Sequence, residues 1–376
     1  MYEKILEISK KLNSKFLFDY DISRLTWFRA GGKTDIYCVI SDENELEIIL
    51  NNIGNTPFLV IGNGSNLLIR DGGFKGLIIK LGKSFNNLFI ENDKIITGAS
   101  ILDVNLAKFA YINSIRNLEF FSGIPGSLGG AIKMNAGCFG SETKDVLFSA
   151  TVMKNNGKKI IIENDELELS YRKSNISDND IVVSAAFNVE FGDKKEIEEE
   201  LKIIKNNRES SQPIKTKTSG SSFKNPTGGH AAELIDLAGC KGLKVGDAVV
   251  SSKHANFLIN TSNATAKQID AGMSYGFCIG GDVQRPSTVL ALTANIRTSD
   301  LATGDWTGAD ETPVPFQAFG GLNKSQGQLV NADGSGKQST NADIGRNGII
   351  TKAHINSRGG HSRGNASTKI ILPRWD

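Results

Sequence analysis

The apolar residues of the first 270 positions gather in short runs, which polar and glycine-containing segments separate. Such runs predict strands. Strands are expected at Asp35–Ile40, Pro57–Ile61, Leu67–Arg70, Gly76–Lys80, Lys94–Thr97, Val146–Met153, Lys159–Ile162, Ile181–Phe191, Ala248–Val250 and Phe257–Asn260. The sequence Asn155-Asn156-Gly157 predicts a tight hairpin turn between two of these strands.

Other segments carry apolar residues at helical spacing. Ser41 is a plausible N-cap for the first helix, which Gly54 ends and whose apolar face is Leu46, Ile49, Leu50 and Ile53. A second helix is expected from about Ser100, with an apolar face of Leu102, Leu106, Phe109 and Ala110. Further helices are expected at Lys195–Ser210 and His230–Ala238. This mixture of helices and strands indicates an α+β protein.

The composition changes at about residue 270. Residues 1–270 contain 27 Lys and 6 Arg, whereas residues 271–376 contain 4 Lys and 6 Arg, with Glu311 as their single glutamate. The later part is rich in Gly, Asn, Ser, Thr and Asp, with strand-like runs at Thr288–Ile296 and Gly348–Ile355 and a turn signal at Ala332-Asp333-Gly334. We expect residues 271–376 to form a β-rich module or a disordered extension unrelated to the rest.

Charge and cysteine content exclude several classes of protein. A formal net charge of +2 with 22% charged residues gives no overall field that would attract nucleic acid. The four cysteines, Cys38, Cys138, Cys240 and Cys278, lie far apart without metal-ligand spacing, so we expect no metal site and a reduced, cytoplasmic location. The sequence has no signal-peptide or membrane-span pattern, so no membrane partner is expected.

Two glycine-rich loops are the first candidates for function. Gly123–Gly140 contains six glycines and no carboxylate, and Ile61–Leu67 (IGNGSNL) is a second turn of this kind. Glycine permits positive φ and lets backbone N–H groups converge on an anion, so two such loops suit the two phosphates of a dinucleotide cofactor. Either loop alone also fits a simple tight turn. Neither a G-x-G-x-x-G that opens a βαβ unit nor a G-x-x-x-x-G-K-[ST] is present, which argues against a Rossmann domain and a P-loop.

Three further segments combine polar side chains in a way that a packed core does not need. They are Tyr171–Ser174 (YRKS), Ser219–Pro226 (SGSSFKNP) and Ser251–Asn260 (SSKHANFLIN). Read singly, they also fit a surface pair, a linker and a histidine beside a helix. Their order along the chain, rather than any one of them, carries the functional signal.

Together with the glycine loops and Thr26–Gly32 (TWFRAGG), these segments resemble the family of UDP-N-acetylenolpyruvoylglucosamine reductases, also called UDP-N-acetylmuramate dehydrogenases. The resemblance covers about residues 20–270. It implies reduction of UDP-N-acetylglucosamine enolpyruvate to UDP-N-acetylmuramate by NADPH, for peptidoglycan synthesis, with non-covalent FAD. It also implies an FAD-binding domain of the vanillyl-alcohol-oxidase (PCMH) type at residues 1–200, split near residue 80, and a small, truncated α/β substrate-binding domain at residues 201–270.

The resemblance assigns the cofactor to the two glycine loops. The backbone around one set of residues would hold the pyrophosphate: Gly62, Asn63, Gly64, Ser65 and Asn66. A second set would line the flavin: Ser122, Gly123, Ile124, Gly126, Ser127 and Gly130. The residue pattern agrees, because a helix that begins near Ser127 would direct the positive end of its dipole towards an anion.

The implied reaction leaves negative charge beside the substrate carboxylate, which calls for a fixed cation and a proton donor. The family's arginine falls on Arg172 with Tyr171 beside it, and its serine proton donor falls on Ser221. Ser222 is the adjacent alternative for the proton donor. The candidates for binding the diphosphates of the substrate and NADPH are Lys217, Lys224 and Asn225.

The resemblance ends near Asp270, and no residue beyond it matches the catalytic glutamate of the family, Glu311 included. Two other interpretations therefore stay open. One is a catalytically impaired flavin-binding scaffold fused to an unrelated β-rich interaction module. The other is an oxidase of the broader flavoprotein class, which ranks last because those oxidases often anchor flavin through a histidine and neither loop has one nearby. As partners we expect only the substrate and NADPH, bound by a monomer.

Overall fold

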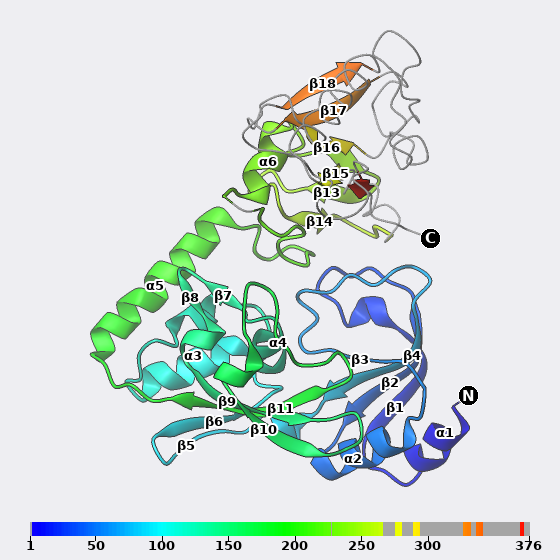
Figure 1. The fold of residues 1–376 in the computed structure, drawn as a ribbon, viewed down its shortest axis with the longest axis vertical. Coiled ribbons are helices and arrows are strands. Elements are labelled where there is room, and N and C mark those ends of the chain that lie inside the picture. The colour runs from blue at the N-terminus through cyan, green and yellow to red at the C-terminus, as the bar shows by residue number, and fades with distance from the viewer. Residues whose placement is uncertain are drawn as a thin grey trace, which may run out of the picture. The chain divides into compact units, whose positions relative to one another are not determined.

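The computed structural model of the chain contains two compact units, Met1–Ser219 and Gly220–Asp376. It describes residues 2–226 and 228–265 and, beyond them, the backbone of five strands between residues 275 and 371. Figure 1 shows the elements, of which α1 to α5 and β1 to β11 belong to the first unit. This mixture of helices and sheets confirms the expected α+β class.

A four-stranded sheet in the order β1-β2-β4-β3 opens the first unit. Strand β1 is antiparallel to β2, whereas β2 and β3 are parallel to β4. Ile36 and Cys38 of β2 pack into the main core together with residues of α2, while Tyr37 packs into a smaller cluster on the opposite face. The elements are α1 Glu3–Ser9, β1 Lys15–Asp21, η1 Ile22–Arg24, β2 Lys33–Ile40, α2 Glu43–Asn52, β3 Phe58–Val60 and β4 Phe74–Leu81.

A five-stranded antiparallel sheet in the order β10-β9-β11-β6-β5 completes the first unit. Helices α3 and α4 lie on one face of it (Figure 1). Gly129 of α4 allows a close approach, because an added Cβ would lie 3.2 Å from the Cβ of Ala99. The strands are β5 Leu88–Glu91, β6 Lys94–Gly98, β9 Leu147–Met153, β10 Lys159–Glu163 and β11 Ile181–Asn188, with a small hairpin of β7 Gly137–Cys138 and β8 Ser141–Glu142. The helices are η2 Lys83–Phe85, α3 Asp103–Ile112, η3 Glu119–Gly123, α4 Leu128–Lys133, η4 Thr143–Asp145, η5 Asp165–Leu167 and α5 Lys194–Ser211.

The hairpin predicted at Asn155-Asn156-Gly157 is confirmed between β9 and β10. Gly157 has φ +77°, and its N–H group donates a hydrogen bond to the Lys154 carbonyl at 2.9 Å. The helix predicted at Lys195–Ser210 is confirmed by α5, which extends one residue further at each end.

Two predicted helix starts are wrong. The N-cap of α2 is Asp42 rather than Ser41, because the Asp42 carboxylate accepts the hydrogen bond of the Glu45 N–H group at 2.9 Å. Helix α3 begins at Asp103 rather than near Ser100. Residues 99–101 before it form a turn and a bend, and the N–H groups of residues 128 and 129 donate to the carbonyls of residues 101 and 99. Leu102 is therefore the N-cap of α3 and is 37% exposed, outside the buried face.

The strand expected at Leu67–Arg70 is also wrong, because this segment has no regular secondary structure and leads into a turn at residues 71 and 72. The Arg70 carbonyl accepts hydrogen bonds from the N–H groups of Gly32 and Gly73, each at 2.9 Å. Gly73 has φ +77°, the left-handed conformation that glycine adopts readily. These bonds replace the ladder that a strand would need.

In the second unit, α6 Ala231–Leu237 begins after its N-cap His230, in agreement with the predicted helix. An antiparallel three-stranded sheet accompanies it, formed by β12 Lys244–Val245, β13 Ala248–Val250 and β14 Leu258–Asn260. The later strands form an antiparallel sheet in the order β18-β17-β16-β15-β19, with bounds Tyr275–Ile279 (β15), Val289–Thr293 (β16), Gln326–Asn331 (β17), Gly336–Thr340 (β18) and Lys369–Ile371 (β19). The predicted run Thr288–Ile296 contains β16. Gly348–Ile355, Ala332-Asp333-Gly334 and Glu311 lie outside the described residues.

Candidate functional site

The two glycine loops, far apart in sequence, touch each other in the first unit. An added Cβ at Gly62 would lie 1.9 Å from the Oγ of Ser127, so a larger residue at this position would have to displace that hydroxyl. The side-chain amide of Asn63 donates a hydrogen bond to the Pro125 carbonyl at 3.4 Å. The fold therefore brings together the residues that the sequence assigned to the pyrophosphate and to the flavin.

The first loop also lies against the segment after η1. Gly64 has φ +68°, and an added Cβ would lie 2.0 Å from the Leu25 carbonyl oxygen. The Trp27 N–H group donates a hydrogen bond to the Gly64 carbonyl at 2.9 Å. These contacts explain why glycine follows Asn63, and they fix the loop that continues through Ser65 and Asn66.

The second loop runs from η3, which contains Ser122 and Gly123, through Ile124 and Gly126 to Ser127. Ser127 is the N-cap residue of α4, so the predicted helix start is confirmed. Its backbone forms an antiparallel bridge with Leu102. Gly130, in the first turn of α4, has no atom within 4 Å of an added Cβ and so faces open space.

The surroundings of these loops fit a dinucleotide cofactor. The Ser122 Oγ is buried and has no hydrogen-bond partner in the described part of the chain, so it is a polar atom in need of one. Three large apolar side chains beside the loops are partly exposed: Trp27 at 39%, Leu102 at 37% and Phe139 at 48%. Converging backbone, an unpartnered hydroxyl and exposed apolar groups suit a ligand that combines phosphates with flat rings.

The cysteine beside the second loop has a structural role. An added Cβ at Gly123 would lie 2.7 Å from the Sγ of Cys138, which donates a hydrogen bond to the Phe120 carbonyl at 3.1 Å. Burial raises the pKa of Cys138 to about 12, although Arg208 opposes this shift. Cys138 is therefore a neutral thiol at physiological pH, and thiolate chemistry is not expected here.

Tyr171 and Arg172 form the tip of a tight turn in the first unit. Ser170 and Lys173 exchange two backbone hydrogen bonds of 3.0 Å across it. Arg172 has φ +53°, a left-handed conformation that costs a non-glycine residue about 1–2 kcal/mol. Its guanidinium carbon lies 5.7 Å from the centre of the half-exposed Tyr171 ring. Strain of this kind at a polar residue is typical of functional sites.

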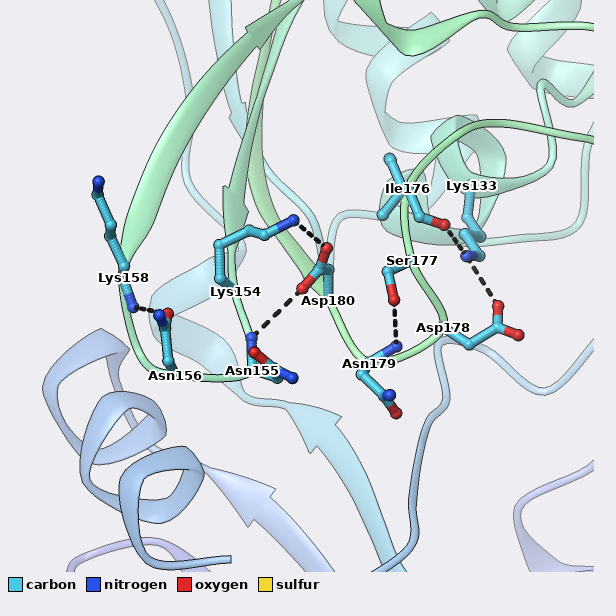
Figure 2. A network of polar contacts seen from close by, with 10 residues as sticks. All are labelled: Lys133, Lys154, Asn155, Asn156, Lys158, Ile176, Ser177, Asp178, Asn179 and Asp180. Carbon is cyan, nitrogen blue, oxygen red and sulfur yellow. Dashed lines mark hydrogen bonds and ion pairs between the residues drawn. The ribbon is translucent and has the colours of Figure 1, made fainter. Parts of the chain in front are cut away.

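Helix α4 connects this turn to the second glycine loop. The Ser174 hydroxyl donates a hydrogen bond to the carbonyl of Lys133, the last residue of α4, at 2.8 Å. Figure 2 shows the Lys133 Nζ directed at the Ile176 carbonyl and at the Asp178 carboxylate, which it contacts at 2.9 Å. Further along, Asp180 accepts hydrogen bonds from Lys154 and from the backbone of residue 155 (Figure 2). One end of α4 thus positions the loop of Ser127, and the other positions the turn of Arg172.

In the second unit, Asn256 holds the segment that contains Ser221. Its side-chain oxygen accepts the Phe223 N–H group at 2.9 Å, and its amide donates to the Phe223 carbonyl at 3.0 Å. The Asn256 carbonyl accepts the Ser222 N–H group at 2.8 Å, and Ser221 forms a backbone bridge with Phe257. Asn256 is only 3% exposed, so two of the polar motifs seen in the sequence form one well-anchored pair.

The three residues predicted to bind the diphosphates lie near one another in sequence but belong to different units. Lys217 belongs to the first unit, whereas Lys224 and Asn225 belong to the second. The Asn225 side-chain oxygen accepts the Ala231 N–H group at 3.1 Å, so Asn225 supports the start of α6. None of the predicted residues lines the open pocket of about 470 Å³ in the second unit, which lies beside Asp236, Lys241 and His254.

Sequence reasoning missed the anchoring roles of Lys133 in the first unit and Asn256 in the second. Each acts on a segment far away in sequence, a contact that no local pattern announces. Within residues 2–226 and 228–265 no cluster of histidine, cysteine and carboxylate groups could hold a metal ion. No helix of that described part combines the length and apolar character needed to cross a bilayer.

Models of known protein families match two parts of the chain. Residues 34–162 match a model of an FAD binding domain, and residues 212–273 match the C-terminal domain of UDP-N-acetylenolpyruvoylglucosamine reductase. The reductase of Rickettsia conorii is 42% identical over 253 residues, which is 67% of this chain and 86% of the relative. The reductase of Parvibaculum lavamentivorans is 42% identical over 261 residues, 69% of this chain and 84% of the relative.

A solved structure is similar over much the same share of the chain. The crystal structure of UDP-N-acetylenolpyruvylglucosamine reductase from Thermus caldophilus matches with a TM-score of 0.63 and 32% identity, over 70% of this chain and 93% of that one. The similarity therefore extends over most of that protein and not over one motif alone.

Proposed function

This chain belongs to the UDP-N-acetylenolpyruvoylglucosamine reductase family, and we propose from that membership that it reduces UDP-N-acetylglucosamine enolpyruvate to UDP-N-acetylmuramate, an FAD-dependent reaction that consumes NADPH. The observation that carries the proposal is the 42% identity to a curated reductase over 253 residues. The two regions that match family models contain both glycine loops and Ser221. None of the comparisons with known proteins favours the scaffold interpretation over this one.

The residues of the two loops fit FAD and would hold it without a covalent bond. FAD, when bound, supplies the hydride that the enolpyruvyl double bond receives. The backbone of residues 62–66 would bind the pyrophosphate, and residues 122–130 would line the flavin. The contact between Gly62 and Ser127 supports this proposal, because it joins the two loops into one surface.

Arg172 would stabilise the negative charge that develops beside the substrate carboxylate. A guanidinium presents a planar fork of N–H donors that matches a carboxylate, and its charge stays fixed at physiological pH. The tight turn between Ser170 and Lys173 limits the positions open to Arg172, so the cation is preorganised. Tyr171 would lie beside the substrate.

Ser221 would donate the proton that completes the reduction. A hydroxyl is a weak acid, so it donates effectively only to a strongly basic carbon in a site closed to water. The hydrogen bonds between Asn256 and Phe223 limit the movement of the Ser221 backbone. The diphosphate groups would be bound by Lys217, Lys224 and Asn225. We also propose that the protein acts as a monomer in the cytoplasm.

Purification of the full chain tests the proposed function directly. We expect FAD to co-purify, visible as a yellow absorbance spectrum, and NADPH oxidation to require UDP-N-acetylglucosamine enolpyruvate. Mass spectrometry should find the product heavier than the substrate by two hydrogens. A protein that binds FAD but oxidises NADPH at the same rate with and without the substrate would contradict the proposed reaction.

Replacement of Arg172 separates its functional role from its structural one. Arg172→Gly relieves the left-handed backbone, so we expect the free energy of unfolding to change by less than about 1 kcal/mol. The same variant should lose about a hundredfold or more in kcat/KM, since the cation for the carboxylate is gone. Arg172→Lys keeps a positive charge without the fork and should retain intermediate activity. Equal kcat/KM values in the wild type, Arg172→Gly and Arg172→Lys would show that Arg172 has no role in the reaction.

A further inference from the structure

Asp103, the first residue of α3, is a buried acid that the proposed reaction does not use. Its side chain is 0% exposed, and neither carboxyl oxygen has a hydrogen-bond partner in the described part of the chain. No ion pair among the described residues includes it. A carboxylate charge left unpaired in such a place is far more costly than a neutral acid.

The Asp103 carboxyl lies directly against the second glycine loop. An added Cβ at Gly126 would lie 2.6 Å from the Asp103 Oδ2, whereas the next residue, Ile124, is 3.6 Å away. The Asp103 N–H group donates to the Gly126 carbonyl at 3.3 Å. Gly126 does not have a positive φ, so a side chain at this position would have to displace the Asp103 carboxyl but would not strain the backbone. The acid and the loop are therefore fitted to each other.

The neighbouring titratable groups offer Asp103 no counter-charge. Cys138, on β7, interacts with this carboxyl and is itself a neutral thiol. On the elements packed against α3, Arg208 of α5 interacts with Cys138, and Glu119 of η3 interacts with Glu200 and Arg116. Burial raises the pKa of Asp103 well above its usual range, and the Gly126 amide, which faces the carboxyl outside hydrogen-bond geometry, opposes this only in part.

We propose that Asp103 is a positioning residue of the flavin loop, an uncharged carboxylic acid that supports Gly126 and so keeps residues 123–127 in the conformation that binds FAD. The inference rests on the proposed function for its FAD part. The neutral state of the acid is a property of the chain itself and is tested without FAD.

The neutral acid has a definite consequence for stability. The pKa of Asp103 is raised in the folded state, so its contribution is fully present below the usual aspartate pKa and is lost as the pH rises to the folded value. Between the usual aspartate pKa and the raised pKa of folded Asp103, the unfolding equilibrium constant of the wild type should rise about tenfold per pH unit relative to that of Asp103→Asn, whose amide does not titrate. If Asp103 were ionised in the folded state, the ratio of the two unfolding constants would not change with pH.

A matched control is available in Glu45, another buried carboxyl of the first unit, 6% exposed. Burial pushes the pKa of Glu45 upward, but hydrogen bonds from Ser14 and Asn13 outweigh it and lower the value. Its stabilising effect is therefore complete above the usual glutamate pKa and constant at neutral pH. Glu45→Gln should destabilise the protein by the same factor at every pH from about 6 to 8 and leave FAD affinity unchanged.

The experiment measures urea unfolding of the FAD-free full chain from about pH 4.5 to pH 8, and FAD binding by quenching of flavin fluorescence. We expect Asp103→Asn to bind FAD within about threefold of the wild type, and Asp103→Ala to bind at least about tenfold more weakly while still folded. Gly126→Ala should also weaken FAD binding. The double variant Asp103→Ala/Gly126→Ala should bind FAD more tightly than Gly126→Ala alone, because the alanine at residue 126 no longer meets the Asp103 carboxyl.

Several results would overturn the inference. A pH-independent ratio of unfolding constants between the wild type and Asp103→Asn would show that the acid is ionised. Unchanged FAD affinity in Asp103→Ala would remove its positioning role, as would additive losses in the double variant. A wild-type protein that does not bind FAD would instead contradict the proposed function, and the unfolding data would still decide the charge of Asp103.

Discussion

Replacing Gly64 with alanine is expected to abolish retention of FAD. The added Cβ would lie 2.0 Å from the Leu25 carbonyl oxygen and 3.1 Å from the Thr26 Cα, both of which are backbone atoms that no rotamer change moves away. The φ of +68° adds a conformational cost of about 1–2 kcal/mol for alanine. Relief requires the segment around Trp27 to separate from the loop, which breaks the hydrogen bond from the Trp27 N–H group.

We expect Gly64→Ala to purify without yellow colour and to bind added FAD at least about a hundredfold more weakly, with a loss of about 2–3 kcal/mol in the free energy of unfolding. Absorbance of the purified protein and urea unfolding measure the two effects. Gly72→Ala is the matched control in the same connection between β3 and β4, because no atom lies within 4 Å of its added Cβ and its φ is not positive. Full FAD occupancy in Gly64→Ala would show that this loop does not hold the cofactor.

Several strands of the first unit, though not β1, β5, β7 or β8, were predictable because their signal is local. The apolar runs that predicted β2, β4, β9 and β10 lie within two residues of the observed bounds. The hairpin between β9 and β10 was predictable for the same reason, since the tolerance of Gly157 for positive φ is a property of one residue.

Two of the wrong predictions share a cause, which is competition from a partner distant in sequence. Leu67–Arg70 has the composition of a strand, but Gly32 and Gly73 take the Arg70 carbonyl. Leu102 has the right spacing for α3, but its backbone pairs with Ser127 instead. Neither outcome is visible in a window of neighbouring residues.

The candidate site was predictable in part. Glycine spacing alone indicated an anion site, and the resemblance of the ordered motifs named the cofactor. The anchoring roles of Asp103, Lys133 and Asn256 could not be read from the sequence, because these roles depend on burial and on contacts across the fold. The domain limits and the roles of individual site residues remain predictions.

Ser221→Ala is expected to lower substrate-dependent NADPH oxidation by about a hundredfold to ten-thousandfold, the range that general acid catalysis typically supplies. Ser221 contacts Phe257 through its backbone, and alanine keeps that bridge. The free energy of unfolding should therefore change by less than about 0.5 kcal/mol. FAD binding should be unchanged, because the glycine loops belong to the other unit. Steady-state kinetics, urea unfolding and flavin absorbance measure the three quantities.

Ser222→Ala is the control that fixes the assignment to one residue. The Ser222 N–H group donates to the Asn256 carbonyl at 2.8 Å, a bond that alanine also makes, so the two variants differ only in which hydroxyl is removed. If Ser221 is the proton donor, Ser222→Ala should keep kcat within about threefold of the wild type. If instead Ser222→Ala loses activity and Ser221→Ala does not, Ser222 is the proton donor. If both variants are as active as the wild type, neither serine delivers the proton, and the carbanion must be protonated by water or by another side chain.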